Sequence, residues 1–148
     1  LSKTIENMHE KDITISEKAK KELEKMNNLT EDIILKTIQI LKERNLQYVL
    51  DVEALKEVSE IKRERYKSEH IQRLKEGTCN VESGISFIEI LTVFEKITYH
   101  CVSTTIAISN LVNNEKFTNK QAFSSRIYAN HSKLLREMLN SYTLKYED

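Results

Sequence analysis

The chain contains no proline and only two glycines, Gly77 and Gly84, among its 148 residues. Proline and glycine are the residues that most often end helices and form tight turns. Charged residues make up 31% of the sequence, and many of them are Lys and Glu, which favour helix. With so few turn-forming residues, the chain can fold only into long helices with few connections. We therefore predict an all-α fold, and the length is that of one domain.

Charge is balanced overall but unevenly distributed. The formal net charge is zero, so bulk electrostatics does not attract the chain to nucleic acid or to an acidic membrane. The first half of the chain is rich in charged side chains, whereas residues 81–112 contain only Lys96, Glu82, Glu89 and Glu95. This contrast predicts that residues 81–112 form the most interior helix.

Two cysteines, Cys79 and Cys101, are too few for a disulfide framework, which favours a reducing, cytoplasmic compartment. They lack the paired C-x-x-C spacing typical of a zinc site. The sequence has no signal peptide and no apolar run of about 18 residues, so we expect this chain to be soluble and to span no membrane. It begins at Leu1 rather than Met, which is compatible with a domain of a longer protein.

Four helices are predicted from apolar periodicity and end signals, in a domain covering 14–148, with 1–13 as a lead-in or the end of a preceding helix. Thr14 and Glu17 have capping-box spacing and open the first helix, which runs to Arg44. Its predicted inward residues recur at helical period: Ala19, Leu23, Met26, Ile33 or Ile34, Ile38 and Leu41.

The second predicted helix follows a break at Asn45 and Leu46 and ends at Gly77, which can adopt the left-handed conformation of a helix stop. We expect Leu50, Ala54, Val58 and Ile61 to face inward, and Lys56, Lys62, Arg63, Glu64 and Lys67 to face outward.

Asn80 is the predicted cap of the third helix, which reaches Val112, and residues 113–116 form the next turn. Thr118 and Gln121 form a second capping box that opens the last helix, with Phe123, Ile127, Leu134, Leu135, Met138 and Tyr142 inward. Connections this short force neighbouring helices to run antiparallel. The predicted architecture is an antiparallel up-down bundle of three to four long helices.

Glu95 is the most informative candidate for chemistry, because it shares a helix face with Tyr99 and with apolar residues. A buried carboxylate must be paired, protonated or bound to a metal. Its partner could be a Tyr, or a Lys or Arg on the second helix; this interpretation is the more common one in proteins. The alternative is a metal cluster to which Glu57 and Glu60 of the second helix contribute, since carboxylates suit hard cations.

Nothing in the sequence indicates an enzyme. A di-iron centre needs two Glu-x-x-His pairs, and only Glu6–His9 has that spacing. We expect the four histidines to lie on the surface or at the edge of the core, and the two cysteines to be small buried hydrophobic residues. His100 and Cys101 are adjacent, so on a helix they point about 100° apart and do not face each other.

The segment from His70 to Cys101 carries a family resemblance. Its beginning, HIQRLKEGTCNVE, resembles the helix end and turn of the PhoU-like domain, in the version attached to bacterial sodium/phosphate cotransporters at their C-terminal side. Its end, EILTVFEKITYH, is similar to a helix of that family with the form D-I-L-x-x-L-E-R-I-x-D-H. The residues that carry the resemblance are His70, Arg73, Gly77, Cys79, Glu95 and His100. Residues 16–146 are compatible with the family, but only 70–101 match in motif.

The resemblance implies a regulatory helical domain that binds metal through Glu-x-x-x-Asp motifs and acts in phosphate homeostasis. The implied partner is a transmembrane transporter domain of the same polypeptide, or another copy of this domain, on the cytoplasmic side of the membrane. A free-standing, metal-binding PhoU-like regulator is the alternative. Here Tyr99 replaces the second acid of the motif, and a phenol is a poor ligand for hard or iron-type cations. We therefore predict that Glu95 is bonded within the bundle rather than to a metal.

Overall fold

The computed structural model describes residues 14–45, 47–113 and 119–147. It contains helices α2 (Glu17–Glu43), α3 (Tyr48–Lys75), α4 (Val81–Asn113) and α5 (Lys120–Lys145). The predicted all-α fold is thereby confirmed. The lead-in predicted for residues 1–13 lies outside the described residues, as do Leu46 and Thr118.

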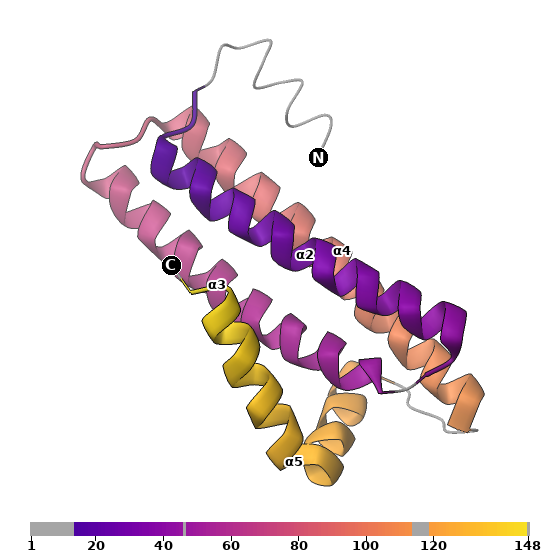
Figure 1. Cartoon of the computed structure of the whole chain (residues 1–148). Helices are drawn as coiled ribbons and strands as arrows, with labels where there is room; N and C mark the ends of the chain where they lie inside the picture. Colours follow the sequence, from indigo (N-terminus) through magenta and orange to yellow (C-terminus); the bar gives the residue numbers. More distant parts are fainter. Residues whose placement is uncertain (1–13, 46, 114–118, 148) are drawn as a thin grey trace.

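Helices α2, α3 and α4 lie side by side, and each runs antiparallel to the one before it in the chain (Figure 1). This part agrees with the predicted up-down bundle. The last helix differs from the prediction, because α5 is bent at His131, where φ is −133° and ψ is 25°. Both parts of α5 are visible in Figure 1, and they pack mainly against α3. None of the described helices is long and apolar enough to cross a membrane.

The first helix begins two residues later than predicted. Ser16, not Thr14, caps α2, and its hydroxyl accepts a hydrogen bond from the Ala19 amide at 3.3 Å. Thr14 instead connects the segment before α2 to the start of α4, because its carbonyl oxygen accepts a hydrogen bond from the Ser83 hydroxyl at 2.7 Å. The sequence offers two hydroxyl residues near this helix end, and the contact with α4 decides between them.

The starts of α4 and α5 are both capped by asparagine. The predicted cap of α4 is confirmed, because the Asn80 side-chain oxygen accepts a hydrogen bond from the Ser83 amide at 2.7 Å. At the start of α5 the prediction was wrong. Asn119 rather than Thr118 is the capping residue, and it accepts a hydrogen bond from the Ala122 amide at 2.9 Å.

Gly77 ends α3 as predicted, with a φ of +68°. Its amide donates to the Leu74 carbonyl at 3.2 Å, and the Thr78 amide donates to the Arg73 carbonyl at 3.1 Å. These two bonds form a Schellman motif, which supplies amide donors to carbonyl groups that have no donor within the helix and requires a left-handed residue at the glycine position. The turn sends the chain directly into α4.

The buried stripe of α2 partly follows the prediction. Ala19, Met26 and Ile33 are fully buried, but Ile38 and Leu41 are 37% and 52% exposed. Two threonines, Thr30 and Thr37, occupy inward positions instead, and each hydroxyl donates to the carbonyl four residues back, at 2.7 and 2.8 Å. A threonine that bonds its own helix in this way can be buried without an unpaired polar group.

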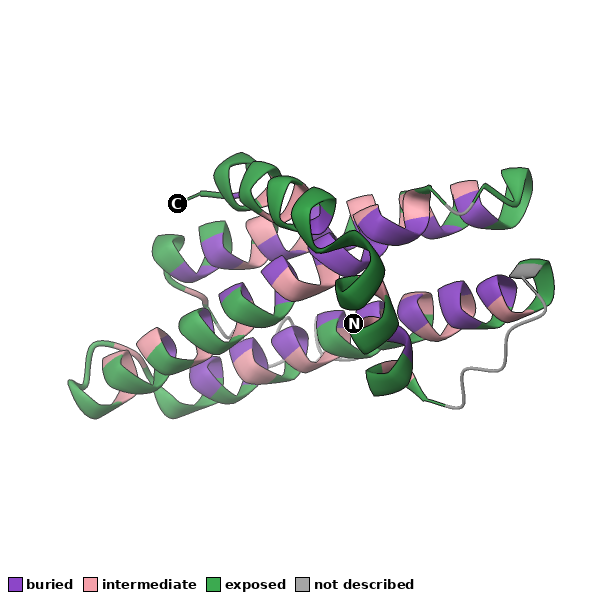
Figure 2. Cartoon of the chain, turned by 90° about the horizontal axis from the view of Figure 1, so that it is seen from below, coloured by how far each residue is buried: buried purple, intermediate pink, exposed green. Residues whose placement is uncertain are grey.

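The register of α3 also differs from the prediction. Val58 is buried as expected, but Ile61 is 58% exposed and its neighbour Lys62 is 7% exposed. The Lys62 ammonium lies 5.5 Å from the centre of the Tyr66 ring. Helix α3 packs against α2, α4 and α5. The aliphatic part of the Lys62 side chain is therefore covered by neighbouring residues. Figure 2 shows how buried and exposed residues alternate along the helices.

Helix α4 is not the fully interior helix that its low charge predicts. One face contributes Phe87, Leu91 and Phe94 to the core, while Val81 and Ile85 on the other face are 69% and 56% exposed. In α5, Phe123 and Leu135 are buried as predicted, whereas Leu134 is 46% exposed. The four charged residues of α4, Glu82, Glu89, Glu95 and Lys96, are all exposed. Low charge therefore marks a helix with one covered apolar face and an open side that is only partly apolar.

Candidate functional site

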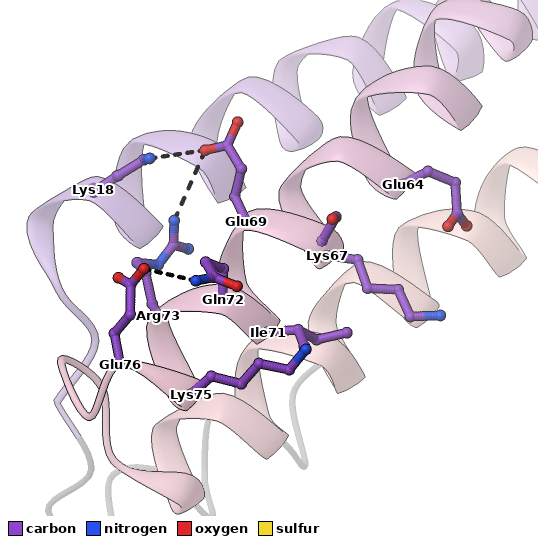
Figure 3. Close-up of a pocket in the computed structure, with 10 residues that line it drawn as sticks. Lys18, Glu64, Lys67, Glu69, Ile71, Gln72, Arg73, Lys75 and Glu76 are labelled. Carbon is purple, nitrogen blue, oxygen red and sulfur yellow. Dashed lines mark hydrogen bonds and ion pairs between the residues drawn. The ribbon is translucent and has the colours of Figure 1, made fainter.

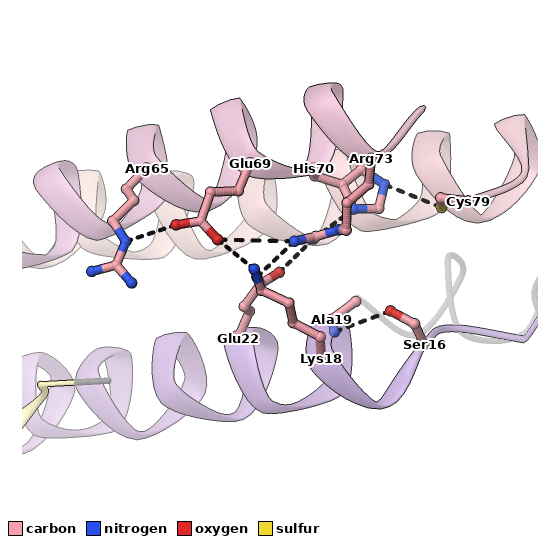
Figure 4. Close-up of polar contacts among 9 residues, drawn as sticks. All are labelled: Ser16, Lys18, Ala19, Glu22, Arg65, Glu69, His70, Arg73 and Cys79. Atoms are coloured by element: carbon pink, nitrogen blue, oxygen red, sulfur yellow. Dashed lines mark hydrogen bonds and ion pairs between the residues drawn. The ribbon is translucent and has the colours of Figure 1, made fainter. Parts of the chain in front are cut away.

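Three residues of the family resemblance, His70, Arg73 and Cys79, gather at one end of the bundle, where α3 turns into α4 (Figure 4). Arg73 reaches from α3 to α2 and donates two hydrogen bonds to the Glu22 carboxylate, at 2.9 and 2.7 Å. Both side chains are largely buried, with exposed fractions of 15% and 6%. A paired fork of this kind holds two helices in fixed register.

His70 is 1% exposed, so the expectation of a surface or core-edge histidine is wrong for this residue. Its ring stacks on Phe87 with a centroid distance of 4.2 Å. Its Nδ1 atom lies 2.9 Å from Nη2 of Arg73. Burial, followed by the charge of Arg73, lowers the pKa of His70 below its ordinary value. The imidazole is therefore held neutral.

The contact between His70 and Cys79 resembles a nucleophile and its base, with 3.7 Å between Nε2 and Sγ. Arg73 rules out that role. A guanidinium only donates hydrogen bonds, so Nδ1 must accept and the proton of the neutral ring must sit on Nε2. Nε2 then donates toward the sulfur and cannot take its proton. The Cys79 thiol itself donates to the Asn80 carbonyl at 3.4 Å. The cluster Glu22–Arg73–His70–Cys79 therefore stabilises the turn.

Outside this cluster, α3 and the start of α2 border an open hollow of about 770 Å³ (Figure 3). Glu69 lies on its wall and pairs with Lys18 at 2.8 Å and with Arg65 at 2.9 Å. Hydrogen bonds from these two cations lower the pKa of Glu69. Gln72 donates to Glu76 at 2.7 Å on the same wall. These side chains bond to one another, so the hollow offers a solvated polar surface.

Glu95 forms an ion pair with Arg63 of α3, with Oε2 2.6 Å from Nη1. This agrees with the ion-pair interpretation, in which a cation on the second helix is the partner. The side chain is 47% exposed, however, so the prediction of a buried carboxylate was wrong. Tyr99 is 55% exposed, and the Lys120 ammonium lies 3.2 Å from the centre of its ring. His100, the last motif residue, is exposed and stands edge-on to Tyr99.

The three carboxylates proposed for a metal cluster do not come together. Glu57 accepts a hydrogen bond from the Tyr128 hydroxyl, and burial followed by this contact raises the pKa of Tyr128. Glu60 and Glu95 border a different hollow. Within the described part of the chain, no group of three or more His, Cys, Asp or Glu side chains is arranged to hold a metal ion.

That second hollow, of about 390 Å³, lies between α3, α4 and the start of α5. Behind it, Glu53 is 1% exposed and accepts hydrogen bonds from Lys56 and Ser124, both at 2.6 Å. Sequence reasoning placed Lys56 on the outer face and did not single out Ser124 or Lys120. Their roles depend on where α5 packs, and no local sequence signal reports that position.

No protein-family model matches this chain, and no curated protein or solved structure shows significant similarity to it. The resemblance to the PhoU-like domain thus rests on residues 70–101.

Proposed function

We propose that this chain is a cytoplasmic regulatory domain of a sodium-dependent phosphate transporter, and that it acts through helix-to-helix contact rather than catalysis. Support for the transporter comes from the resemblance of residues 70–101. Support for a contact role comes from the motif residues themselves, because His70, Arg73 and Cys79 bond to one another and to Glu22. They build a rigid end of the bundle and leave no general base for chemistry.

The observation that carries the contact role is the exposure of apolar side chains at the two ends of α4. Val81 and Ile85, one turn apart near its start, are 69% and 56% exposed, and Leu111 near its end is 84% exposed. Large apolar side chains that are exposed together are typical of protein contact sites. Because Glu89 and Lys96 lie exposed between the two ends, a partner would contact the ends of α4 rather than its whole length.

Phosphate uptake tests this proposal in cells that express the whole transporter. Sodium-dependent uptake is measured with the domain intact, with the domain deleted, and with the double substitution Ile85→Glu and Leu111→Glu. We expect the double variant to reproduce the effect of the deletion, because buried carboxylates would disrupt helix packing. Ile61→Glu is the matched control, since Ile61 is similarly exposed but lies on α3. If deletion leaves uptake unchanged, the regulatory role is wrong.

The alternative of a free-standing metal-binding regulator has less support. Of its proposed ligands, Glu57 is bonded to Tyr128 and Glu95 to Arg63. A metal would have to displace both partners, and a guanidinium beside the ion would oppose its charge. Metal analysis of the purified protein tests this alternative, and a stoichiometric divalent or iron-type metal that is lost in Glu95→Gln would favour it over the transporter domain.

A further inference from the structure

The hollow between α3, α4 and the start of α5 is lined by charged side chains of both signs. Its walls carry three cations, Lys56, Arg63 and Lys120, and two carboxylates, Glu60 and Glu95. Two of the cations form ion pairs, since Lys56 bonds to Glu53 behind the wall and Arg63 bonds to Glu95. Lys120 and Glu60 remain, and the charge of Glu60 acts on Lys120 without an ion pair between the two among the described residues.

Lys120 has no carboxylate within ion-pair distance among the residues that the structure describes, and its ammonium rests on the face of the Tyr99 ring at 3.2 Å. Burial, followed by the nearby charge of Lys56, lowers the pKa of Lys120, and the charges of Glu60 and Glu53 oppose this only in part. A bound anion would oppose it further, because an opposite charge favours the protonated form.

Thr98 supplies an independent indication of a ligand. It lines the hollow and is 5% exposed, yet its hydroxyl has no hydrogen-bond partner in the described part of the structure. The neighbouring threonines of α4 behave differently. Thr92, Thr104 and Thr105 each donate to the carbonyl four residues back, at 2.9 to 3.0 Å. The Thr98 hydroxyl thus differs from these three threonines, although the Ser109 hydroxyl of α4 is likewise without a described partner. A buried polar group of this kind normally has one.

Two further donors belong to the same walls. The Nε atom of Arg63 is buried and, among the described residues, has no partner. Lys120 and Gln121 lie in the first turn of α5, a helix of 26 residues, and both line the hollow. Amide groups in a first helical turn have no acceptor within the helix, and they carry the positive end of the helix dipole. Anions are commonly bound at such helix starts.

We propose that this hollow binds one small anion with oxygen acceptors, a carboxylate or a phosphate. Lys120 supplies the charge, the Thr98 hydroxyl and the first turn of α5 donate hydrogen bonds, and Arg63 flanks the site while it remains paired with Glu95. The site is distinct from the exposed apolar side chains of Ile85 and Leu111, so it stands independently of the proposed function.

The test is a titration of the isotope-labelled whole chain with inorganic phosphate, and separately with acetate, followed by amide chemical shifts at an ionic strength held constant with chloride. We expect saturable shifts at Thr98, Tyr99, Lys120 and Gln121 for at least one of the two anions. Lys120→Gln should weaken binding at least tenfold, and Thr98→Val should weaken it several-fold. Which anion binds more tightly identifies the ligand class.

Matched controls separate the site from general charge effects. Thr105→Val removes a buried hydroxyl of α4 that already has a partner, and Lys96→Gln removes an exposed cation of the same helix. Both should bind as the unaltered chain does. Thr98→Val should fold normally, because it removes a hydroxyl with no described partner, and circular dichroism checks this. The proposal is overturned if neither anion saturates, or if Lys120→Gln and Thr98→Val bind as tightly as the two controls.

Discussion

Arg73 and Glu22 join α3 to α2 through two hydrogen bonds, from Nη1 to Oε1 at 2.9 Å and from Nη2 to Oε2 at 2.7 Å. The Glu22 side chain is only 6% exposed, and Lys18 is a second, more distant cation at 3.9 Å. Arg73 also donates to His70. One side chain therefore joins two helices and sets the tautomer of a buried imidazole.

Replacing Arg73 should strongly destabilise the bundle. Arg73→Met leaves the buried Glu22 with only the more distant Lys18, at 3.9 Å. Removing the main partner of a buried charge typically costs about 3–5 kcal/mol in the free energy of unfolding. Urea denaturation followed by circular dichroism measures this loss. The double variant Glu22→Leu with Arg73→Met should recover most of it, since well-packed apolar residues often replace a buried ion pair without loss. If Arg73→Met alone unfolds at the same urea concentration as the unaltered chain, the pair is not buried in solution.

Stability should fall as the pH drops below about 6.5, the ordinary pKa of histidine. Burial lowers the pKa of His70, so below that pH the unfolded chain binds a proton that the folded chain rejects. Urea unfolding at pH 7.5, 6.5 and 5.5 measures this slope. His70→Gln should be less stable at pH 7.5 but should show a shallower loss toward pH 5.5. An unchanged slope in this variant would assign the pH dependence to other groups.

The register of α3 can be tested with one pair of substitutions. Val58 is 2% exposed and Ile61 is 58% exposed, although helical periodicity places both inward. Ile61→Lys should therefore change the free energy of unfolding by no more than about 0.5 kcal/mol. Val58→Lys should prevent folding or cost several kcal/mol, because it buries an unpaired ammonium. Thermal unfolding followed by circular dichroism compares them, and equal losses would contradict the observed register.

Gly77 should tolerate side chains poorly even though there is space for one. A Cβ atom at this position would have no neighbour within 4 Å, so any cost comes from the backbone φ of +68°. We expect Gly77→Ala to cost about 1 kcal/mol in the free energy of unfolding. Gly77→Asn should cost less, because asparagine enters the left-handed region more readily. Equal stability of the Ala variant and the unaltered chain in urea would show that the turn adopts another conformation.

The second part of α5 should open without unfolding the rest of the bundle. Asp32 of α2 accepts a hydrogen bond from the Tyr146 hydroxyl at 2.6 Å and also binds Lys145. Asp32→Ala removes both bonds, so amide hydrogen exchange in residues 132–145 should accelerate at least tenfold. A tenfold change corresponds to an opening free energy that is lower by about 1.4 kcal/mol. Exchange in α3 should not change.

Glu31→Ala is the matched control for this prediction, since Glu31 is an exposed acid next to Asp32. Exchange in that variant should resemble exchange in the unaltered chain. Uniform acceleration across all four helices in Asp32→Ala would show instead that α5 and the rest of the bundle open as one unit.

The positions of the helices and of their breaks follow from local chemistry and were predictable. Gly77 and Asn80 end one helix and begin the next because of their own backbone and side-chain preferences, and the structure bears out both. Thr14 and Thr118 show the limit of such signals. Ser16 and Asn119 lie close by and are the capping residues instead, and capping preference alone does not distinguish such neighbouring candidates.

Which faces are buried was less predictable, because burial depends on how many helices surround each element. Periodicity assumes one covered face, yet α3 packs against three neighbours. Lys62 is consequently buried while Ile61 is exposed. The same applies to the candidate sites. Glu95 was correctly singled out as a paired residue, whereas the partnership of Lys120 with Tyr99 depends on contact between two helices.

The sequence by itself determined that this chain is all-helical and where α3 ends and α4 begins, since these properties depend on residue type and short-range spacing. Only the tertiary structure decided that Arg73 joins Glu22, that Glu95 pairs with Arg63, and that Thr98 and Lys120 border one hollow. Those features arise from side chains far apart in the sequence. Their meeting depends on the packing of whole helices, which no local pattern specifies.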